Sequence, residues 1–165
     1  MTAVVVDTNV AVVANGKARQ AGPACIMACI AALRKALRDE IIVLDRGRQI
    51  LDEYRRHLSP SGQPGVGDAF FKFLWQNQAN PDRCELVDLH PKERSAENFD
   101  EFPDDPELAG FDRQDRKFVA AARASKLDPT VLNATDTDWW EYREVLARHD
   151  VRVKFLCPDL MRVRH

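Results

Sequence analysis

The sequence predicts an α/β fold, a three-layer α/β/α sandwich around a mainly parallel five-stranded sheet in the order 3-2-1-4-5. Apolar runs of strand length alternate with amphipathic helical patterns along the whole chain. No repeat or low-complexity segment interrupts this alternation, and 165 residues are the length of one ordinary domain. We therefore expect a single domain that spans residues 1 to 165.

Five short apolar segments are the expected strands. They cover residues 3 to 7, 41 to 45, 84 to 89, 130 to 135 and 151 to 157. Because helical patterns separate these segments, we expect the strands to run parallel and the sheet to be covered on both faces.

Helical patterns with one apolar face fill the intervals between the strands. They cover residues 22 to 40, 46 to 58, 68 to 78, 112 to 125 and 136 to 149. Pro23 suits the first turn of the first helix, where its missing N–H has no partner to lose. The stretch 59 to 67 contains two prolines and three glycines, which predicts a flexible surface loop.

The composition is typical of a soluble globular protein, with 45% hydrophobic and 30% charged residues. The longest weakly polar window, residues 23 to 33, is too short to span a membrane. The first residues lack the basic start of a signal peptide, which favours a cytoplasmic location. A net charge of −2 does not indicate a broadly basic nucleic-acid binder, so a nucleic acid would have to meet a local patch.

The four cysteines, Cys25, Cys29, Cys84 and Cys157, include no CxxC pair. We therefore expect neither a disulfide framework nor a zinc site. Cys25 and Cys29 lie one helical turn apart, as two metal ligands would, but no second pair of ligands completes the set. Buried free thiols are the expectation for these residues.

Two aspartates stand where strands are expected to end. Asp7 closes the first strand, and Asp136 follows the fourth. In the order 3-2-1-4-5 these two strands are neighbours, and open parallel sheets bind ligands beyond the carboxyl ends of their strands. The alternative for either residue is a helix cap, because an aspartate oxygen accepts a backbone N–H in the first turn.

Two further carboxylates can reach the same edge of the sheet from flanking helices. Glu53 lies on the second helix, and Asp115 lies near the start of the fourth. The alternative for Glu53 is a solvent-facing ion pair with Arg56 or His57. Asp115, like Asp112 three residues earlier, is also suited to stabilising the start of its helix.

Four short motifs, VVVDTNV, EY, DRKFVAAA and ATDTDWW, occur in this order on the expected elements. Together they resemble the acidic motifs of PIN-domain nucleases, and the similarity spans nearly the whole chain. The resemblance implies a three-layer α/β/α fold, a divalent metal ion and, usually, cleavage of RNA. It further implies RNA as a partner and leaves room for an antitoxin or other regulatory protein and for a homodimer. Because the sequence has no window long enough to span a membrane, we expect no membrane partner.

The resemblance also assigns residues to the site. The four principal acidic positions match Asp7, Glu53, Asp115 and Asp136. The auxiliary positions match Asn9 and Asp138, and Asp112 is an alternative to Asp115. The family commonly has Thr or Ser two residues before the fourth-strand aspartate, where this chain has Ala134, and Trp139 stands where a phenylalanine is frequent.

Crowded carboxylates repel one another unless a cation neutralises them or some of them are protonated. Hard oxygen ligands select Mg²⁺ or Mn²⁺. We expect Asp7, Asp115 and Asp136 as the main ligands, with Glu53 binding a metal ion or positioning water. In a two-metal arrangement one ion lowers the pKa of the attacking water and the other stabilises the leaving oxygen. The prediction is a metal-dependent phosphodiester hydrolase, an RNA endonuclease without a covalent enzyme intermediate.

Basic side chains flank the expected acidic site and predict contacts with the nucleic-acid backbone. The candidates are Arg46, Arg48, Arg56 and Arg116. The alternative for each is an ordinary solvated helix surface. The loop 59 to 67 is the expected place of substrate selection.

Two other functions compete with the nuclease. The first is a catalytically weak PIN-like module that binds RNA or a protein. The second is a phosphotransferase with a strand-end aspartate nucleophile, which normally has a second aspartate where Asn9 stands. The histidines lack a partner motif for a nucleophile, which argues against a Ser-His-Asp hydrolase. They are His57, His90, His149 and His165.

Overall fold

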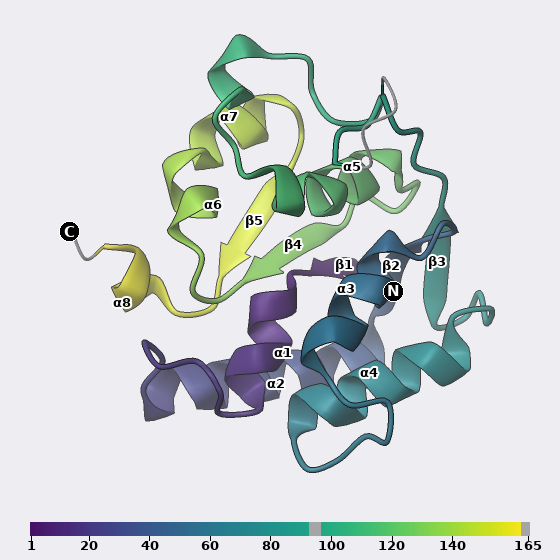
Figure 1. Cartoon of the computed structure of the whole chain (residues 1–165), viewed down its shortest axis with the longest axis vertical. Coiled ribbons are helices and arrows are strands. Elements are labelled where there is room, and N and C mark those ends of the chain that lie inside the picture. Colours follow the sequence, from purple (N-terminus) through teal and green to yellow (C-terminus); the bar gives the residue numbers. More distant parts are fainter. Residues whose placement is uncertain (93–96, 163–165) are drawn as a thin grey trace.

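A five-stranded sheet lies at the centre of the computed structural model, which describes residues 1–92 and 97–162 (Figure 1). The strand order is β3-β2-β1-β4-β5 and every pairing is parallel, which confirms the predicted order and fold class. The strands are β1 (Ala3–Val6), β2 (Ile41–Asp45), β3 (Cys84–Val87), β4 (Thr130–Asn133) and β5 (Arg152–Phe155).

Helices connect the strands and cover both faces of the sheet (Figure 1). They are α1 (Thr8–Ala14), α2 (Pro23–Asp39), α3 (Gln49–His57), α4 (Val66–Asn77), α5 (Arg116–Ala124), α6 (Thr137–Glu141), α7 (Arg143–Arg148) and α8 (Pro158–Met161). Two 3-10 turns, η1 (Pro106–Leu108) and η2 (Arg113–Asp115), precede α5. Helices α1, α2 and α4 pack together on one side, whereas α5 crosses β1, β2 and β4 on the other.

The carboxyl ends of β1 and β4 lie side by side, as the strand order requires. Val6 is in register with Leu132, and the Asp7 N–H donates to the Leu132 carbonyl at 3.1 Å. β1 consists of buried apolar residues, and in β4 the apolar Val131 and Leu132 and the polar Asn133 are buried. The residues that follow them, Asp7 and Asp136, therefore emerge at the same edge of the sheet.

Three helical segments differ from the sequence prediction. Helix α1 follows β1 without a loop, and Val10 and Val13, residues of a type that favours strands, are buried in the core. Tertiary packing there outweighs the weak helix propensity of β-branched residues. The expected helix 136 to 149 is divided at Tyr142 into α6 and α7, and α8 adds one short helix after β5.

One side chain holds both ends of the loop between α3 and α4. Asp68, in the first turn of α4, accepts hydrogen bonds from the Ser59 N–H at 2.8 Å and the Gly65 N–H at 2.9 Å. Helix α4 begins at Val66, earlier than the expected residue 68. The predicted flexibility of this loop stays a prediction.

The cysteines correct the prediction of free thiols. Cys25 and Cys157 form a disulfide across 132 residues of sequence and join α2 to the start of α8. The prediction was therefore wrong for these two residues, and it is confirmed for Cys29 and Cys84, which are free and buried. Sequence spacing does not reveal the pair, because only the folded sheet brings the end of β5 to α2.

Two of the four histidines are engaged with carboxylates. The His90 Nδ1 lies 2.8 Å from the Glu101 carboxylate, and the His149 Nε2 lies 2.8 Å from that of Asp105. His165 lies outside the described residues. Within residues 1–92 and 97–162, no helix is both long and apolar enough to cross a membrane.

Candidate metal centre

Three carboxylates converge at the carboxyl ends of β1 and β4. Asp7, Asp115 and Asp136 each offer one oxygen, and these oxygens all lie within 4.8 Å of one another. Asp7 and Asp115 are buried, with 3% and 8% of their surface exposed, and Asp136 is half-buried. We call these three residues the acidic site. Three of the four principal residues that the sequence predicted therefore meet in space.

Asp7 is fixed by hydrogen bonds to both of its carboxylate oxygens. One oxygen accepts the Asn9 N–H at 3.3 Å and caps α1. The other accepts the indole N–H of Trp139 at 2.7 Å, and the Trp139 side chain is fully buried. The helix-cap role considered from the sequence is thus present together with the predicted place in an acidic cluster.

Two asparagines fix the position of Asp136. The Asn133 side chain, fully buried at the end of β4, donates to the Asp136 carbonyl at 3.1 Å and accepts the Asp136 N–H at 3.3 Å. The Asn9 amide donates to Asn133 Oδ1, and its carbonyl oxygen accepts the Ala134 N–H, both at 2.9 Å. Asn9, predicted as auxiliary, therefore ties the start of α1 to the end of β4.

Asn133 was missed from the sequence. A signal was available, because an asparagine interrupts the apolar pattern of TVLNAT at the end of the expected strand. Ala134 itself is fully buried at the position where the resembling family has a hydroxyl. The polar bonds around it come from Asn9 and Asn133 instead.

Asp115 has a buried carboxylate oxygen that stands without a partner among the described residues. Its Oδ2 is buried and has no hydrogen-bond partner among the residues that the structure describes. Burial, followed by the charge of Asp7 and the contact with Asp136, raises the pKa of Asp115 to about 11. Such an oxygen fits a hard divalent cation, which would neutralise the charge that burial and neighbouring carboxylates disfavour.

The pKa of Asp7 is raised as well. Burial is the main cause that raises the pKa of Asp7 to about 7, and the charges of Asp136 and Glu53 add to it. Hydrogen bonds from Asn9 and Trp139 favour the ionised form and oppose this rise. Without a cation, the acidic site therefore holds protons at a pH where isolated aspartates are ionised.

Glu53, the fourth predicted ligand, lies beside the acidic site in a different pairing. Its Oε1 lies 2.6 Å from the Lys117 ammonium, and its Oε2 accepts the Thr8 hydroxyl. The next residue, Tyr54, donates its hydroxyl to the Val6 carbonyl and so anchors α3 to the end of β1. The alternative considered from the sequence, a solvent-facing ion pair with Arg56 or His57, is wrong, because Glu53 is buried and pairs with Lys117.

Asp112 and Asp138 connect the two flanks of the acidic site. The Asp112 N–H donates to Asp138 Oδ2 at 3.0 Å, which joins η2 to α6. Asp112 Oδ1 accepts the Gln114 N–H at 3.0 Å and caps η2. Burial is the first cause that raises the pKa of Asp138. Of the two candidates for the third acidic position, Asp115 is the one in the cluster.

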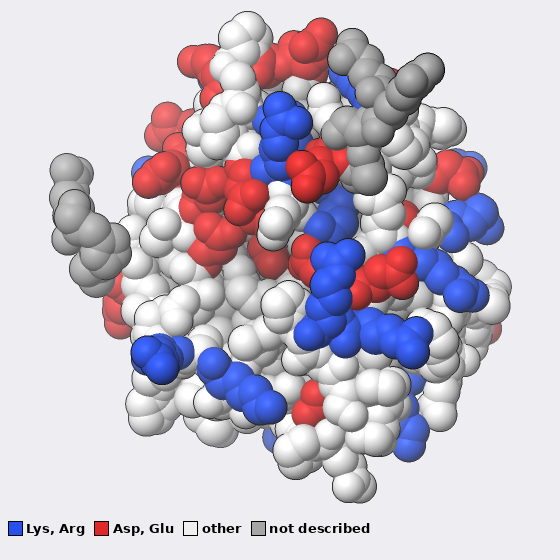
Figure 2. All heavy atoms as spheres, in the orientation of Figure 1, with Lys and Arg blue, Asp and Glu red and all other residues white. Residues whose placement is uncertain are grey.

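Two hollows open at the acidic site and beside it, and Glu53 and Gln114 line both of them. The first has a volume of about 570 Å³ and the second about 400 Å³. The first is lined by Asp7, Asn9, Glu53, Asp115 and Asp136, with Lys17 and Arg19 among its basic residues. The second is lined by Glu53, Arg56, Arg113 and Lys117. On this face, acidic side chains gather near the starts of α5 and α6, and basic ones extend toward α3 (Figure 2).

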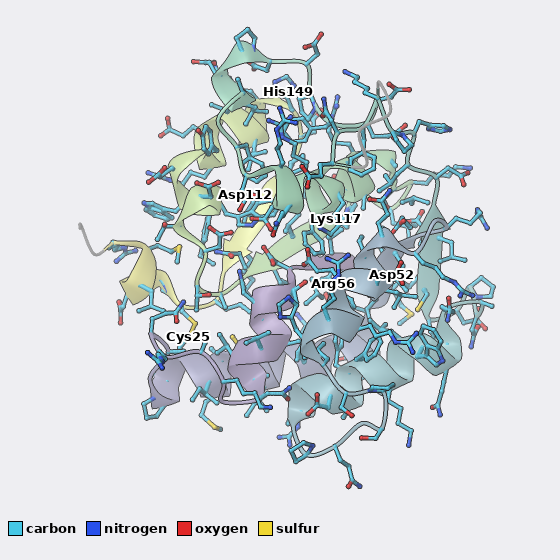
Figure 3. The ribbon with its side chains drawn as sticks, in the orientation of Figure 1. Cys25, Asp52, Arg56, Asp112, Lys117 and His149 are labelled. Atoms are coloured by element: carbon cyan, nitrogen blue, oxygen red, sulfur yellow. A yellow bond between two sulfur atoms is a disulfide. The ribbon has the colours of Figure 1, made fainter. Side chains whose placement is uncertain are left out.

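The four predicted arginines lie in different places. Arg56 lines the second hollow, and Figure 3 shows Asp112, Lys117 and Arg56 in succession from the start of α5 to α3. Arg46 pairs with Asp88 at 3.0 Å on the exposed surface. Arg48 stacks over Trp75, with its guanidinium carbon 5.7 Å from the ring centroid.

Arg116 is buried and engaged within the chain. Its guanidinium donates to the carbonyls of Leu108, Ala109 and Phe111, and it lies 4.6 Å from the centre of the Phe102 ring. Its guanidinium thus fastens the η1 segment to α5. Lys17 and Arg19, in the loop after α1, were not among the predicted contacts although they line the first hollow.

Comparison with known proteins found no matching family model, no matching curated protein and no matching solved structure. The geometry of the acidic site is therefore the basis on which a function is proposed. Chemically, three converging carboxylates, one of them with an unpartnered buried oxygen, are suited to holding a hard cation beside a cavity whose lining includes Lys17 and Arg19.

Proposed function

We propose that this protein is a metal-dependent phosphodiester hydrolase, specifically an RNA endonuclease that uses Mg²⁺ or Mn²⁺. The observation that carries the proposal is the unpartnered Asp115 oxygen within reach of Asp7 and Asp136, at the sheet edge where parallel α/β folds bind ligands. The choice of RNA rests on the resemblance of the four acidic motifs to those of PIN-domain nucleases.

Asp7, Asp115 and Asp136 are the residues that would hold the cation. All three supply carboxylate oxygens, the ligand type that Mg²⁺ and Mn²⁺ prefer. A bound divalent cation supplies Lewis-acid activation of water and neutralises charge on the phosphate. The chain itself keeps the ligands in place, because the Trp139 indole holds Asp7 and the Asn133 amide holds the backbone of Asp136.

Glu53 is placed to orient water rather than to add a fourth ligand to the cluster. Thr8 and Lys117 each fix one of its oxygens, and it lines both hollows. A carboxylate whose orientation is fixed by two neighbours can hold a water molecule at a constant angle to the acidic site. The ammonium of Lys117 also offsets part of the negative charge that faces an incoming phosphodiester.

The basic residues of the two hollows would bind the nucleic-acid backbone. Lys17 and Arg19 line the first hollow, and Arg56, Arg113 and Lys117 line the second. A strand that follows these cations passes over the acidic site although the whole chain has a net charge of −2. Binding through such contacts weakens as the salt concentration rises.

The second candidate is a PIN-like module that binds RNA or a protein with little catalysis. One observation favours it, because the Lys117 ammonium occupies a Glu53 oxygen that a fully catalytic acidic set would leave for metal or water. The two candidates differ in a measurable way. The hydrolase loses turnover when the acidic site is neutralised, whereas the module keeps RNA binding and has no turnover to lose.

Cleavage of end-labelled single-stranded RNA tests the proposal, with Mn²⁺, Mg²⁺ or EDTA added to equally purified proteins. Wild type should cleave with either metal and not with EDTA, and Asp7→Asn should be inactive. Asp39→Asn is the matched control, because Asp39 is an exposed α2 residue paired with Arg38. Cleavage that persists equally in Asp7→Asn would contradict the proposal, and RNA binding without cleavage by any of the three would favour the binding module.

A further inference from the structure

Three cysteine sulfurs meet at a second place in the fold. Cys25 and Cys29 lie one turn apart on α2, and Cys157 stands at the start of α8. Their sulfur atoms all lie within 4.8 Å of one another. Figure 3 marks Cys25 at the start of α2, and Figure 1 shows that α8 lies near this end of the helix. We call these residues the thiol cluster.

The thiol cluster contains one more sulfur than its disulfide uses. Cys25 and Cys157 are bonded to each other, and Cys29 is a free thiol with no exposed surface. The disulfide accounts for Cys25 and Cys157 but not for Cys29. Packing does not require a cysteine there either, because an alanine or valine fills a core position without a reactive group. The sequence offered Cys25 and Cys29 as half of a metal-ligand set, and the fold brings Cys157 to them as the third sulfur.

We infer that the reduced thiol cluster binds one thiophilic cation of the Zn²⁺ type, through Cys25, Cys29 and Cys157. Soft sulfur ligands select Zn²⁺ or Cu(I) over Mg²⁺ and Mn²⁺, so the ligand differs in class from that of the acidic site. The inference stands independently of the proposed function, since it uses neither the acidic site nor RNA.

The Cys25–Cys157 disulfide must be reduced before the cation binds. A cellular dithiol, or two small-molecule thiols, gives two electrons and two protons to the Cys25–Cys157 bond and becomes a disulfide itself. The chain then carries three thiols at this place. The cation displaces the protons of the thiols that it binds, because the thiolate is the ligand form of cysteine.

Two features of the surroundings suit a thiolate-bound cation. Cys25 lies in the first turn of the 17-residue helix α2, whose positive end stabilises a thiolate. The helix begins after Gly22, which has no side chain to cap these N–H groups. A cavity of about 270 Å³ is lined by Cys25, Cys157 and Asp159, and it leaves room for a fourth ligand, either water or the Asp159 carboxylate.

The test titrates Cd²⁺ into the full chain and follows the ultraviolet sulfur-to-metal charge-transfer band, which the carboxylates of the acidic site do not produce. Reduced wild type should bind one equivalent, and the same protein with its disulfide intact should show no such band. Cys29→Ser keeps the disulfide pair and should bind at least about tenfold more weakly, because even an outer-shell change costs that much affinity. Cys84→Ser removes the other buried free thiol and should bind as wild type does.

Near-ultraviolet circular dichroism, recorded in the same titration, shows whether the tryptophans keep their folded environment. Only variants that remain folded by this measure are compared. Cys157→Ser provides a second variant in case Cys29→Ser folds poorly. The inference is overturned if folded, reduced wild type shows no band. It is equally overturned if both Cys29→Ser and Cys157→Ser bind Cd²⁺ as tightly as wild type, or if Cys84→Ser abolishes binding.

Discussion

The acidic site and the thiol cluster are built in opposite ways. The acidic site lies at the carboxyl ends of two adjacent strands. Hydrogen bonds from Trp139 and Asn9 hold the Asp7 carboxylate, and Asn133 holds the backbone of Asp136. The thiol cluster lies between α2 and α8, and a covalent bond holds two of its sulfurs together. Like charges repel in the first region, whereas neutral sulfurs pack as apolar groups in the second.

This difference decides how each region responds to its surroundings. The acidic site responds to pH, since burial and mutual repulsion raise the pKa of Asp7 and of Asp115. The thiol cluster responds to reduction instead, because disulfide-bonded cysteines do not titrate. Proton and hard-cation concentrations should therefore act on one region, and thiols and soft cations on the other.

The largest expected effect comes from Asp115→Asn. RNA cleavage should fall to the background level, because the variant removes a carboxylate that would hold the cation. The same change should raise the melting temperature in EDTA, since folding no longer has to protonate a carboxyl that is buried beside Asp7 and Asp136. Cleavage assays and thermal melts check both outcomes. A variant that cleaves normally, or that melts at a lower temperature in EDTA than wild type does, would contradict the role of Asp115 as a ligand of the cation.

Reduction of the Cys25–Cys157 bond should produce the next largest effect, on stability alone. Opening a cross-link that spans 132 residues should lower the free energy of unfolding by about 4 kcal/mol. Urea unfolding with and without a reductant, in the absence of thiophilic metals, measures this difference. The rate of RNA cleavage by the folded protein should not change. A change would mean that the regions are coupled, and the contact between Met161 and Asn133 at 3.8 Å would be the first connection to test.

A smaller loss is expected for Trp139→Phe. The variant keeps an aromatic ring in the core but removes the N–H that Asp7 accepts at 2.7 Å. Affinity for Mn²⁺ should fall about tenfold, as for other outer-shell partners of metal ligands. The control is Trp140→Phe, because Trp140 packs on Phe155 at 5.1 Å between ring centroids. Equal losses in the two variants would mean that general packing, not the bond to Asp7, sets the affinity.

The last expected effect is the pH dependence of the metal-free protein. The folded chain keeps the Asp7 proton up to a pKa of about 7, whereas an aspartate without such neighbours has a pKa of 3.8. The folded state therefore binds more protons over this range, and its stability falls as the pH rises from about 4 through 7. Asp115 extends the fall to higher pH, since its pKa is about 11.

Thermal melts in EDTA at pH 5 and pH 8 test this dependence. Wild type should melt at a higher temperature at pH 5 than at pH 8, and Asp7→Asn should show a smaller difference. Saturating Mg²⁺ should restore stability mainly at pH 8, because the cation competes with protons for the same oxygens. A difference between the two pH values that is the same in wild type and Asp7→Asn would contradict the raised pKa.

The sequence predicted the fold and most of the acidic site for a physical reason. In a parallel sheet, the order of strands alone brings Asp7 and Asp136 to one edge, and both residues could be placed at strand ends from the apolar pattern. Asp115 required the additional motif DRKFVAAA. The contacts of Trp139 with Asp7 and of Lys117 with Glu53 depend on how helices pack, and no short pattern encodes that packing. For Asn133 the asparagine at the end of TVLN was a signal.

The thiol cluster shows the limit of reasoning from spacing. Cys25 and Cys29 were recognised as neighbours on one helix, but Cys157 lies 132 residues away from Cys25 and meets it through β5 and α8. Helix α8 was not predicted, so nothing in the sequence placed Cys157 beside α2. The buried Arg116 was misjudged for the same reason, because its carbonyl partners lie in the η1 segment.

The most direct test of the central claim is Mn²⁺ binding to metal-free protein, followed by electron paramagnetic resonance of the free ion. Wild type with its disulfide intact should bind Mn²⁺, more tightly at pH 8 than at pH 6, and Asp115→Asn should lose this binding while Asp39→Asn keeps it. Binding that is absent from wild type, or equal in wild type and Asp115→Asn, would contradict the claim that Asp7, Asp115 and Asp136 hold a divalent cation.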